Sequence, residues 1–442
     1  MKRLPGETLA VLAPTIFAYA VAAWCLAALT WDGAGYVFNS LQAGAPVISH
    51  HRYTNWPSLA IVVLAGNLAG NARALGVLYG VLVSLTPILS LAFGLHFLRE
   101  PRLRPLRVWL ALGILWSALP GEICLMSEAS LAVQVFWVVL AFVAAGTPSQ
   151  GTKWMLPISA WLFFLHPTTA VMFATAAFLC AGAGWKSRNR RSWKWGVVFA
   201  ALAVARFGFS AATITPYERA EFGFKPNWDA FQGSIWGWPT WLLVFLYLFG
   251  ALCLLAVMKP SIAANARRAG LVAVVAFLAS GLWWASDSTL WAGAIGYRRF
   301  VLICTLPLVG MAMVHWSRIH SEGAGPLSGA TPALVAAIFA AIYTVQCLSW
   351  RADVRRFEST LAASNSPFIT LESEPWMKHR PLDHWGSSML SAILQGRHPR
   401  VLYAETSAHI KGDDIELFPG GWLRMEDGWF RLASRRSEKP AP

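Results

Sequence analysis

An acidic residue follows the first long apolar run of the chain, in the stretch TWDGAGYVFN at residues 30–39. Spacings of four and seven place Asp32, Tyr36 and Asn39 on one face of a helix that starts after this run. A carboxylate held beside a hydroxyl or an amine acts as a general base. Asp32 is also well placed to cap the helix, because its side-chain oxygen can accept from a backbone N–H of the first turn. The spacing alone leaves both roles open.

Two more acids occur close together in LPGEICLMSEAS, residues 119–130. A second carboxylate near Asp32 would bind a divalent metal or polarise an acceptor group. Glu128 has a simpler alternative role, since an acid favours the N-terminus of a following helix through the helix dipole. Glu122 follows Pro-Gly and has less structural reason to be there. Either acid is therefore a candidate for chemistry, with Glu122 the first choice.

A third group of residues could hold an anionic head group. Arginine binds phosphate bidentately, and histidine and tyrosine add hydrogen-bond donors. The alternative for any single cation is that it only extends from a span end towards water. The candidates are His50, His51, Arg52, His166, Tyr217, Arg219, Arg298 and Arg299.

The composition identifies the elements that must carry these residues. Of the 442 residues, 56% are hydrophobic and 13% are charged, whereas soluble domains carry about 25% charged residues. Several apolar runs reach the ~20 residues needed to cross a bilayer. The sequence therefore predicts an all-α polytopic membrane protein. The net charge of +14 comes mostly from short clusters between apolar runs, which act as topology signals rather than a nucleic-acid surface.

We predict about eleven transmembrane helices. Three basic segments, REPRLRPLR, KSRNRRSWK and KPSIAANARR, lie between apolar runs and are cytoplasmic by the positive-inside rule. The N-terminus is then cytoplasmic and the C-terminus extracytoplasmic. The predicted spans are residues 8–30, 74–98, 106–120, 129–146, 154–165, 167–184, 195–212, 240–258, 269–286, 298–316 and 331–349.

Two assignments rest on the number of crossings that keeps all three basic segments cytoplasmic. Residues 57–72 are apolar, but a crossing there would export the first basic segment, so we expect an interfacial or re-entrant segment within a first external loop at 31–73. Residues 154–184 must cross twice. Pro167 in FFLHPTT disfavours helix at His166 and marks the break.

The chain divides into a membrane domain, residues 1–350, and a small α+β extracytoplasmic domain, residues 351–442. We expect strands in SPFITLES and RVLYAE, a helix in DHWGSSMLSAIL and a hairpin in GWLRMEDGWFRLA with its turn at Asp427–Gly428. The final SRRSEKPAP should be disordered.

Few ionisable residues lie near the middle of any predicted span, whereas pumps and transporters keep functional charges there. The polar groups gather at the outer interface instead. This distribution favours work on a substrate whose lipid tail lies in the membrane and whose head group lies outside.

This pattern resembles the GT-C superfamily of membrane glycosyltransferases, which includes protein O-mannosyltransferases and the aminoarabinose transferases acting on lipid A. TWDGAGYVFNSL resembles the first-loop motif, with Asp32 at the acid and Tyr36 at the following aromatic residue. GEICLMSE is similar to the second acidic loop, and GYRRFVLICTLPL to the basic-aromatic entry of a late span. FFLHPTTAV resembles a broken helix pair of such enzymes.

The resemblance implies inverting transfer of a sugar from a polyprenyl-phosphate donor to a lipid, glycan or protein at the external face. Asp32 would be the base or orient the acceptor, and Glu122 or Glu128 would assist. Arg298 and Arg299, with Arg219 or His166, would hold the phosphate. The first loop has one acid rather than a pair, which leaves a divalent metal cofactor, Mg²⁺ or Mn²⁺, open.

The alternative is a non-catalytic partner in envelope assembly or a flippase for lipid-linked glycans. A flippase needs a hydrophilic path, and the predicted spans are poor in polar residues. A structural partner is compatible with acids that serve only as helix caps. The composition, rich in Ala, Arg and Trp, suggests a bacterial inner membrane.

Overall fold

The structure is a computed structural model of the chain. It describes residues 6–30, 32–48, 53–69, 71–100, 103, 106–116, 128–214, 330–377, 382, 386–396, 399–404, 410–411, 414–417, 421–426 and 429–432.

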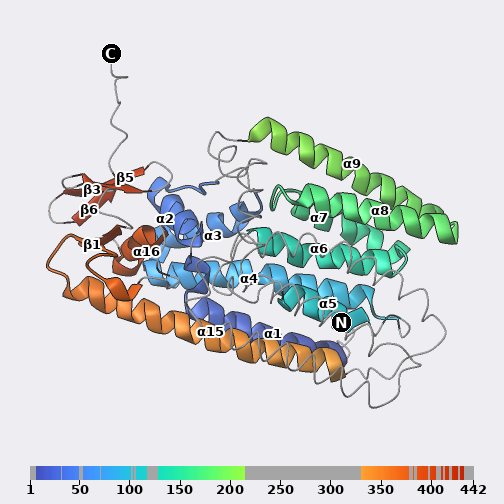
Figure 1. The fold of residues 1–442 in the computed structure, drawn as a ribbon, viewed down its shortest axis with the longest axis horizontal. Helices are drawn as coiled ribbons and strands as arrows, with labels where there is room; N and C mark the ends of the chain where they lie inside the picture. The colour runs from blue at the N-terminus through green and yellow to red at the C-terminus, as the bar shows by residue number, and fades with distance from the viewer. Residues whose placement is uncertain are drawn as a thin grey trace, which may run out of the picture.

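Most of the described residues form helices that lie side by side along the long axis of the molecule (Figure 1). Four of the helices in this part of the chain are long and apolar enough to cross a membrane, at Gly6–Trp24, Ala72–Phe97, Arg190–Thr213 and Pro332–Ala363. The helical elements are α1 (Gly6–Trp24), η1 (Ala27–Leu29), α2 (Asp32–Ala43), η2 (Tyr53–Asn55), α3 (Trp56–Ala69), α4 (Ala72–Phe97), α5 (Leu106–Trp116), α6 (Glu128–Ala144), η4 (Ser149–Gly151), α7 (Thr152–Phe163), α8 (Thr169–Ser187), α9 (Arg190–Thr213) and α15 (Ala330–Ala363).

Helices occupy the predicted spans that fall on described residues, and the spans at 240–258, 269–286 and 298–316 lie outside them. The first helix ends earlier than predicted. Its α-helical part stops at Trp24, because Leu26 takes a left-handed backbone conformation (φ 62°) and turns the chain into η1. The predicted end at residue 30 therefore includes a turn.

The last helix extends well beyond its predicted end at 349. Trp350, Val354, Phe357 and Leu361 are all buried and recur every three or four residues, so α15 continues to Ala363 as an amphipathic helix. The prediction stopped where the apolar run stopped. As a result, the predicted domain start at 351 falls inside α15.

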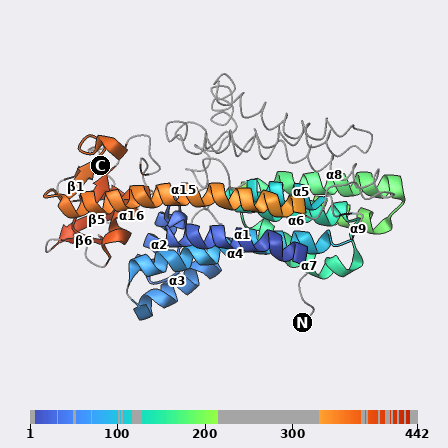
Figure 2. The same cartoon turned by 90° about the horizontal axis from the view of Figure 1, so that it is seen from below.

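The apolar segment at 57–72 forms a separate short helix. α3 has 14 residues, fewer than the ~20 that a bilayer crossing needs. Asn71, which follows this segment, caps the next helix: its side chain accepts from the backbone N–H groups of Arg73 and Ala74 at the start of α4. α3 packs beside α2 and α4 (Figure 2).

One end of the molecule gathers the first turn of α1 and the starts of α5 and α9. Glu7 forms an ion pair with Arg107 at 2.8 Å. The Phe142 ring lies 5.6 Å from Phe97 and 5.2 Å from Trp195, between the ends of α4 and α6 and the start of α9. The described parts of the first two basic segments therefore lie at the same end as the start of α1.

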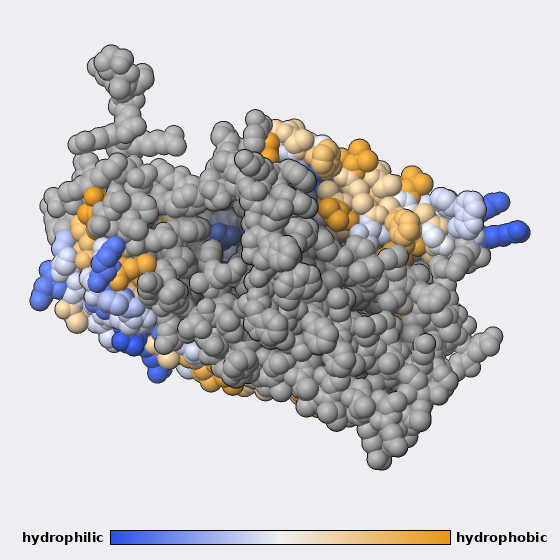
Figure 3. Space-filling model, in the orientation of Figure 1, coloured by the Kyte–Doolittle hydropathy of each residue, from blue (hydrophilic) through white to orange (hydrophobic). Residues whose placement is uncertain are grey.

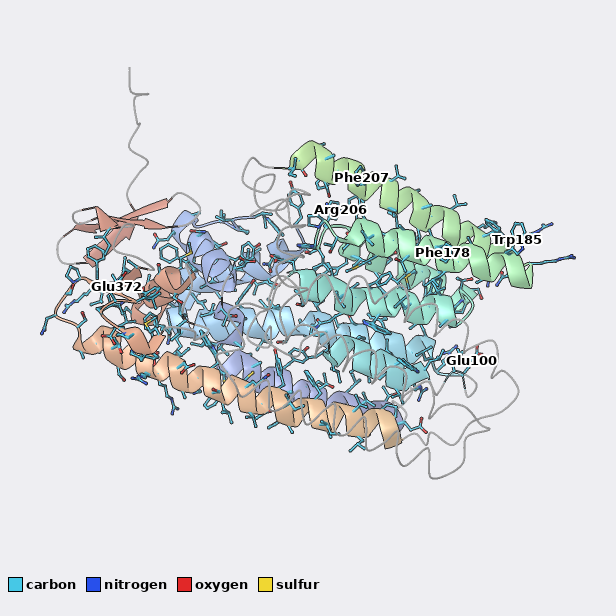
Figure 4. The ribbon with its side chains drawn as sticks, in the orientation of Figure 1. Glu100, Phe178, Trp185, Arg206, Phe207 and Glu372 are labelled. Atoms are coloured by element: carbon cyan, nitrogen blue, oxygen red, sulfur yellow. The ribbon has the colours of Figure 1, made fainter. Side chains whose placement is uncertain are left out.

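The opposite end carries α2, α3 and the C-terminal domain. In Figure 4 Glu100 and Trp185 mark one end, and Glu372 of the C-terminal domain marks the other. This arrangement follows from the alternating direction of successive helices.

Helices α8 and α9 present an apolar outer face (Figure 3). Phe178, Trp185, Val204 and Phe207 are 67%, 78%, 74% and 72% exposed. Side chains of this size on one continuous face would be costly in water and are suited to lipid. Together with the long apolar helices, this face indicates a membrane-embedded protein.

The predicted elements of the C-terminal domain are present. β1 (Phe368–Thr370) pairs in parallel with β2 (Leu402–Ala404), and β3 (Ile410–Lys411), β4 (Asp414–Leu417), β5 (Gly421–Glu426) and β6 (Trp429–Leu432) form an antiparallel sheet. In the predicted hairpin, Glu426 pairs with Trp429, and the predicted turn at Asp427–Gly428 lies outside the described residues. The expected disordered end lies outside the described residues.

The remaining helix of this domain, α16 (Gly386–Gln395), is packed on both sides. It contacts α2, α4 and α15, and also β2 (Figure 1). Its serines are buried but hydrogen-bonded: Ser387 donates to the carbonyl of Leu382, and Ser391 accepts from the backbone N–H of Tyr403. The C-terminal domain is thus docked directly on the helix that begins with Asp32.

Candidate functional site

A tight corner between α1 and α2 positions Asp32. After η1, the Thr30 hydroxyl donates to the carbonyl of Ala27 at 2.9 Å. The carbonyl of Thr30 accepts from the N–H of Gly33 at 3.0 Å. These bonds set the direction of α2, and Asp32 lies in its first turn, half-buried.

Three glycines allow this corner to sit directly on α4. A Cβ at Gly33 would lie 1.7 Å from the carbonyl oxygen of Ala28 and 3.6 Å from a ring carbon of Tyr79. On α4, a Cβ at Gly76 would lie 2.6 Å from Leu29, and one at Gly80 would lie 2.9 Å from a backbone atom of α1. The residue after Asp32 is therefore fixed against the ring of Tyr79.

Tyr79 is a buried tyrosine of α4. Its hydroxyl is within the electrostatic influence of Glu128 and, more weakly, of Asp32. It lies 3.0 Å from Nδ2 and 3.2 Å from Oδ1 of Asn55, which comes from η2. Tyr79 is 1% exposed and Glu128 is 3% exposed. We call Asp32, Asn55, Tyr79 and Glu128 the acidic site.

The burial of Glu128 bears on its role. Glu128 lies in the first turn of α6, as the helix-dipole interpretation requires. However, interaction with the dipole is available to an exposed carboxylate, and burying a carboxylate is costly unless it has partners. A buried acid that acts electrostatically on a buried tyrosine hydroxyl is a candidate for a functional role.

The element η2 connects the acidic site to the helix break at residues 164–168. The hydroxyl of Thr54 donates to the carbonyl of Phe164 at 3.4 Å, and the ring of Tyr53 meets that of Phe164 edge-on at 5.9 Å. The predicted break is thus present between α7 and α8, and Asn55 follows directly in the chain. His166 is brought to the same end of the bundle as the acids.

His166 closes the turn at the start of α8. Its Nδ1 accepts from the backbone N–H of Thr168 at 3.3 Å and lies 2.9 Å from the hydroxyl of that residue. Its carbonyl accepts from Thr169. An Nδ1 that accepts a hydrogen bond places the proton of a neutral imidazole on Nε2. Nε2 is therefore the ring nitrogen that can donate a hydrogen bond.

Arg206 adds a buried cation beside the break. The residue is 2% exposed, and its guanidinium carbon lies 5.6 Å from the Phe163 ring and 5.2 Å from the Phe209 ring. Its neighbour Phe207 faces outwards (Figure 4). Arg206 falls inside the predicted span at 195–212, but it is not among the site residues predicted from the sequence.

Asp32 and Glu128 thus both act electrostatically on Tyr79, and η2 links Tyr79 to the helix break that carries His166. Tyr36 lies one turn along α2 and is buried. Tyr79 and Asn55 are not among the residues predicted from the sequence. The sequence signal that could have identified Tyr79 is its polar hydroxyl within the apolar run at residues 74–98. The predicted residues His50, His51, Arg52, Glu122, Tyr217, Arg219, Arg298 and Arg299 lie outside the described part of the chain.

The two acids also bear on the metal question. Carboxylate oxygens are the ligands that Mg²⁺ and Mn²⁺ prefer. Within the part of the chain that the structure describes, no three residues of the types His, Cys, Asp and Glu are grouped as a metal site would require.

Comparison with known proteins found no match to this chain among protein-family models, curated proteins or solved structures.

Proposed function

We propose that this chain is a membrane glycosyltransferase that moves a sugar from a polyprenyl-phosphate donor to an acceptor at the external face of the membrane. The observation that carries the proposal is that Asp32 and Glu128 both act electrostatically on the buried hydroxyl of Tyr79, which is hydrogen-bonded to Asn55 of the first loop. Two acids from separate loops, held near a membrane surface, suit a reaction on a lipid-linked head group.

In this proposal the acceptor's hydroxyl or amine gives its proton to Asp32 as its oxygen or nitrogen attacks the anomeric carbon. The bond between that carbon and the phosphate oxygen breaks, and polyprenyl phosphate leaves. Attack from the face opposite the leaving group inverts the configuration. Glu128 and the Tyr79 hydroxyl orient the acceptor. The positive charges proposed to hold the phosphate are Arg219, Arg298 and Arg299, with His166 as a hydrogen-bond donor.

The same proposal includes the GT-C-like architecture with about eleven spans, a cytoplasmic N-terminus and a bacterial inner-membrane location. It is supported by the basic segments that share one end with the start of α1, and by the C-terminal domain at the other end. A Mg²⁺ or Mn²⁺ ion bound by Asp32 and Glu128 would polarise the donor or acceptor.

The test is consumption of donor by the purified full-length protein in lipid nanodiscs with a native lipid extract. A panel of polyprenyl-phosphate sugars is supplied, with and without EDTA. Asp32→Asn keeps the size of the side chain and removes the base, which should lower the rate by about 10²- to 10⁴-fold. Glu372→Gln removes an exposed carboxylate at the same end and should leave the rate unchanged.

Equal rates for Asp32→Asn and the unaltered protein would overturn the role of Asp32. Failure of the unaltered protein to consume any donor would favour the non-catalytic alternative. A fluorescent lipid-linked glycan in proteoliposomes then tests transport, because a flippase would move it between leaflets without breaking the sugar–phosphate bond.

A further inference from the structure

Polar side chains from three helices lie in the interior of the bundle, away from the acidic site. Tyr19 of α1 and Gln134 of α6 are neighbours, and the Tyr19 ring stacks at a tilt on Tyr343 of α15 with centroids 5.2 Å apart. Gln346 and Trp350 continue the same face of α15, since they follow Tyr343 by three and seven residues. We call Tyr19, Gln134, Gln346 and Trp350 the polar seam.

The seam is closed to bulk solvent. Tyr19 and Trp350 are each 1% exposed, Gln134 is 2% exposed and Gln346 is 5% exposed. α1 and α15 pack against each other along their length (Figures 1 and 2). Gln134 lies six residues beyond Glu128 on α6, which is roughly 9 Å along the helix axis. The seam is therefore deeper in the bundle than Glu128.

The polar atoms of the seam have hydrogen-bonding capacity that the described residues do not use. The Tyr19 hydroxyl interacts with the side chain of Gln134, but neither this hydroxyl nor Gln134 Oε1 has a partner in full hydrogen-bond geometry, and both polar atoms of the Gln346 amide lack a partner. The indole Nε1 of Trp350 likewise has no hydrogen-bond partner among the described residues.

The chemistry of these atoms defines what would occupy the seam. It offers donors from Trp350, Gln346 and Tyr19 and acceptors from both glutamines, with no charged group among its members. A metal ion or an anion would find no compensating charge. Water donates and accepts at once and makes two to four hydrogen bonds in buried sites of this kind.

We propose that the polar seam is a binding site for ordered water inside the helix bundle. The bound water links α1, α6 and α15 by hydrogen bonds where direct ones are absent. The site does not depend on the proposed glycosyl transfer, because none of its residues belongs to the acidic site.

The test is radiolytic hydroxyl-radical footprinting of the full-length protein in nanodiscs. Radicals generated from bound water oxidise adjacent side chains even when bulk solvent cannot reach them. Cys347 lies beside Tyr19, and Cys180 of α8 is the matched control; both thiols are 0% exposed and outside any disulfide. Cys347 should be oxidised severalfold faster than Cys180. Trp350 should likewise exceed Trp195, which is 5% exposed.

Two variants, Gln134→Leu and Gln346→Leu, replace the amides by apolar side chains of similar size. Each should lower the oxidation rate of Cys347 towards that of Cys180. Equal rates for Cys347 and Cys180 in the unaltered protein would overturn the proposal. Because both cysteines are measured in one sample, this comparison holds even if a variant fails to fold.

Discussion

The hydroxyl of Tyr79 lies 3.0 Å from Nδ2 of Asn55, and this contact joins the first loop to α4 at a tyrosine on which Asp32 and Glu128 both act electrostatically. η2, which contains Asn55, also contacts the helix break through Thr54 and Tyr53. A three-residue turn therefore connects the acids to the break. Substitution of Tyr79 or Asn55 should therefore lower donor consumption more than it lowers the free energy of unfolding.

Tyr79→Phe and Asn55→Ala test this contact as a double-mutant cycle. Each change should lower stability by about 1 kcal/mol, which is the usual net value of one hydrogen bond. The two effects should not add, because both variants remove the same bond. Thermal unfolding in detergent gives the stabilities, and donor consumption gives the rates. Full additivity in both measurements would show that the pair does not act as a unit.

Glu128→Gln should reduce donor consumption at least 10-fold without loss of helix, because the amide keeps the hydrogen-bonding shape but not the charge acting on Tyr79. The helix-dipole role alone is worth ~0.3–1 kcal/mol of stability and predicts no effect on rate. Circular dichroism measures helix content in parallel. A normal rate with a small loss of stability would assign Glu128 to the helix cap alone.

Gly33→Ala tests whether the corner after η1 sets the position of Asp32. Its Cβ would lie 1.7 Å from the carbonyl of Ala28, so α2 must shift. We expect about 1–3 kcal/mol of destabilisation and loss of donor consumption.

Gly208→Ala in α9 is the matched control, because nothing lies within 4 Å of its Cβ. It should stabilise the helix by about 0.5–1 kcal/mol and leave the rate unchanged. Normal activity in Gly33→Ala would mean that the corner tolerates displacement and that Asp32 needs no exact placement.

Glu7→Gln tests the opposite end of the bundle. Arg107 is buried, and it pairs with Glu7 at 2.8 Å while its Nε donates to the carbonyl of Leu98. Loss of the ion pair should cost about 1–2 kcal/mol, less than for a fully buried pair because the Glu7 side chain is 38% exposed. The melting temperature should fall by a few degrees. Donor consumption by the remaining folded protein should be unchanged, since the acidic site lies at the other end.

Local patterns were sufficient for much of the fold. The position of α4, the break beside Pro167 and the β5–β6 hairpin all follow from apolar run length, proline chemistry and a turn dipeptide. Predictions based on the apolar runs alone were less accurate at both ends of the first domain. α1 stops at Trp24 because Leu26 turns the backbone, and α15 continues to Ala363 because its last turns are amphipathic.

The sequence by itself determined that this chain is apolar, helical and membrane-embedded, and it named Asp32, Glu122 and Glu128 as candidate acids, with Glu122 ahead of Glu128. Only the tertiary structure decided that Asp32 and Glu128 both act electrostatically on Tyr79, because their loops are separated by two helices and approach Tyr79 through packing. The docking of α16 on α2 has the same origin. Spacing along a chain reports which residues share one helix face, whereas contacts between helices depend on close approach at residues such as Gly76 and Gly80.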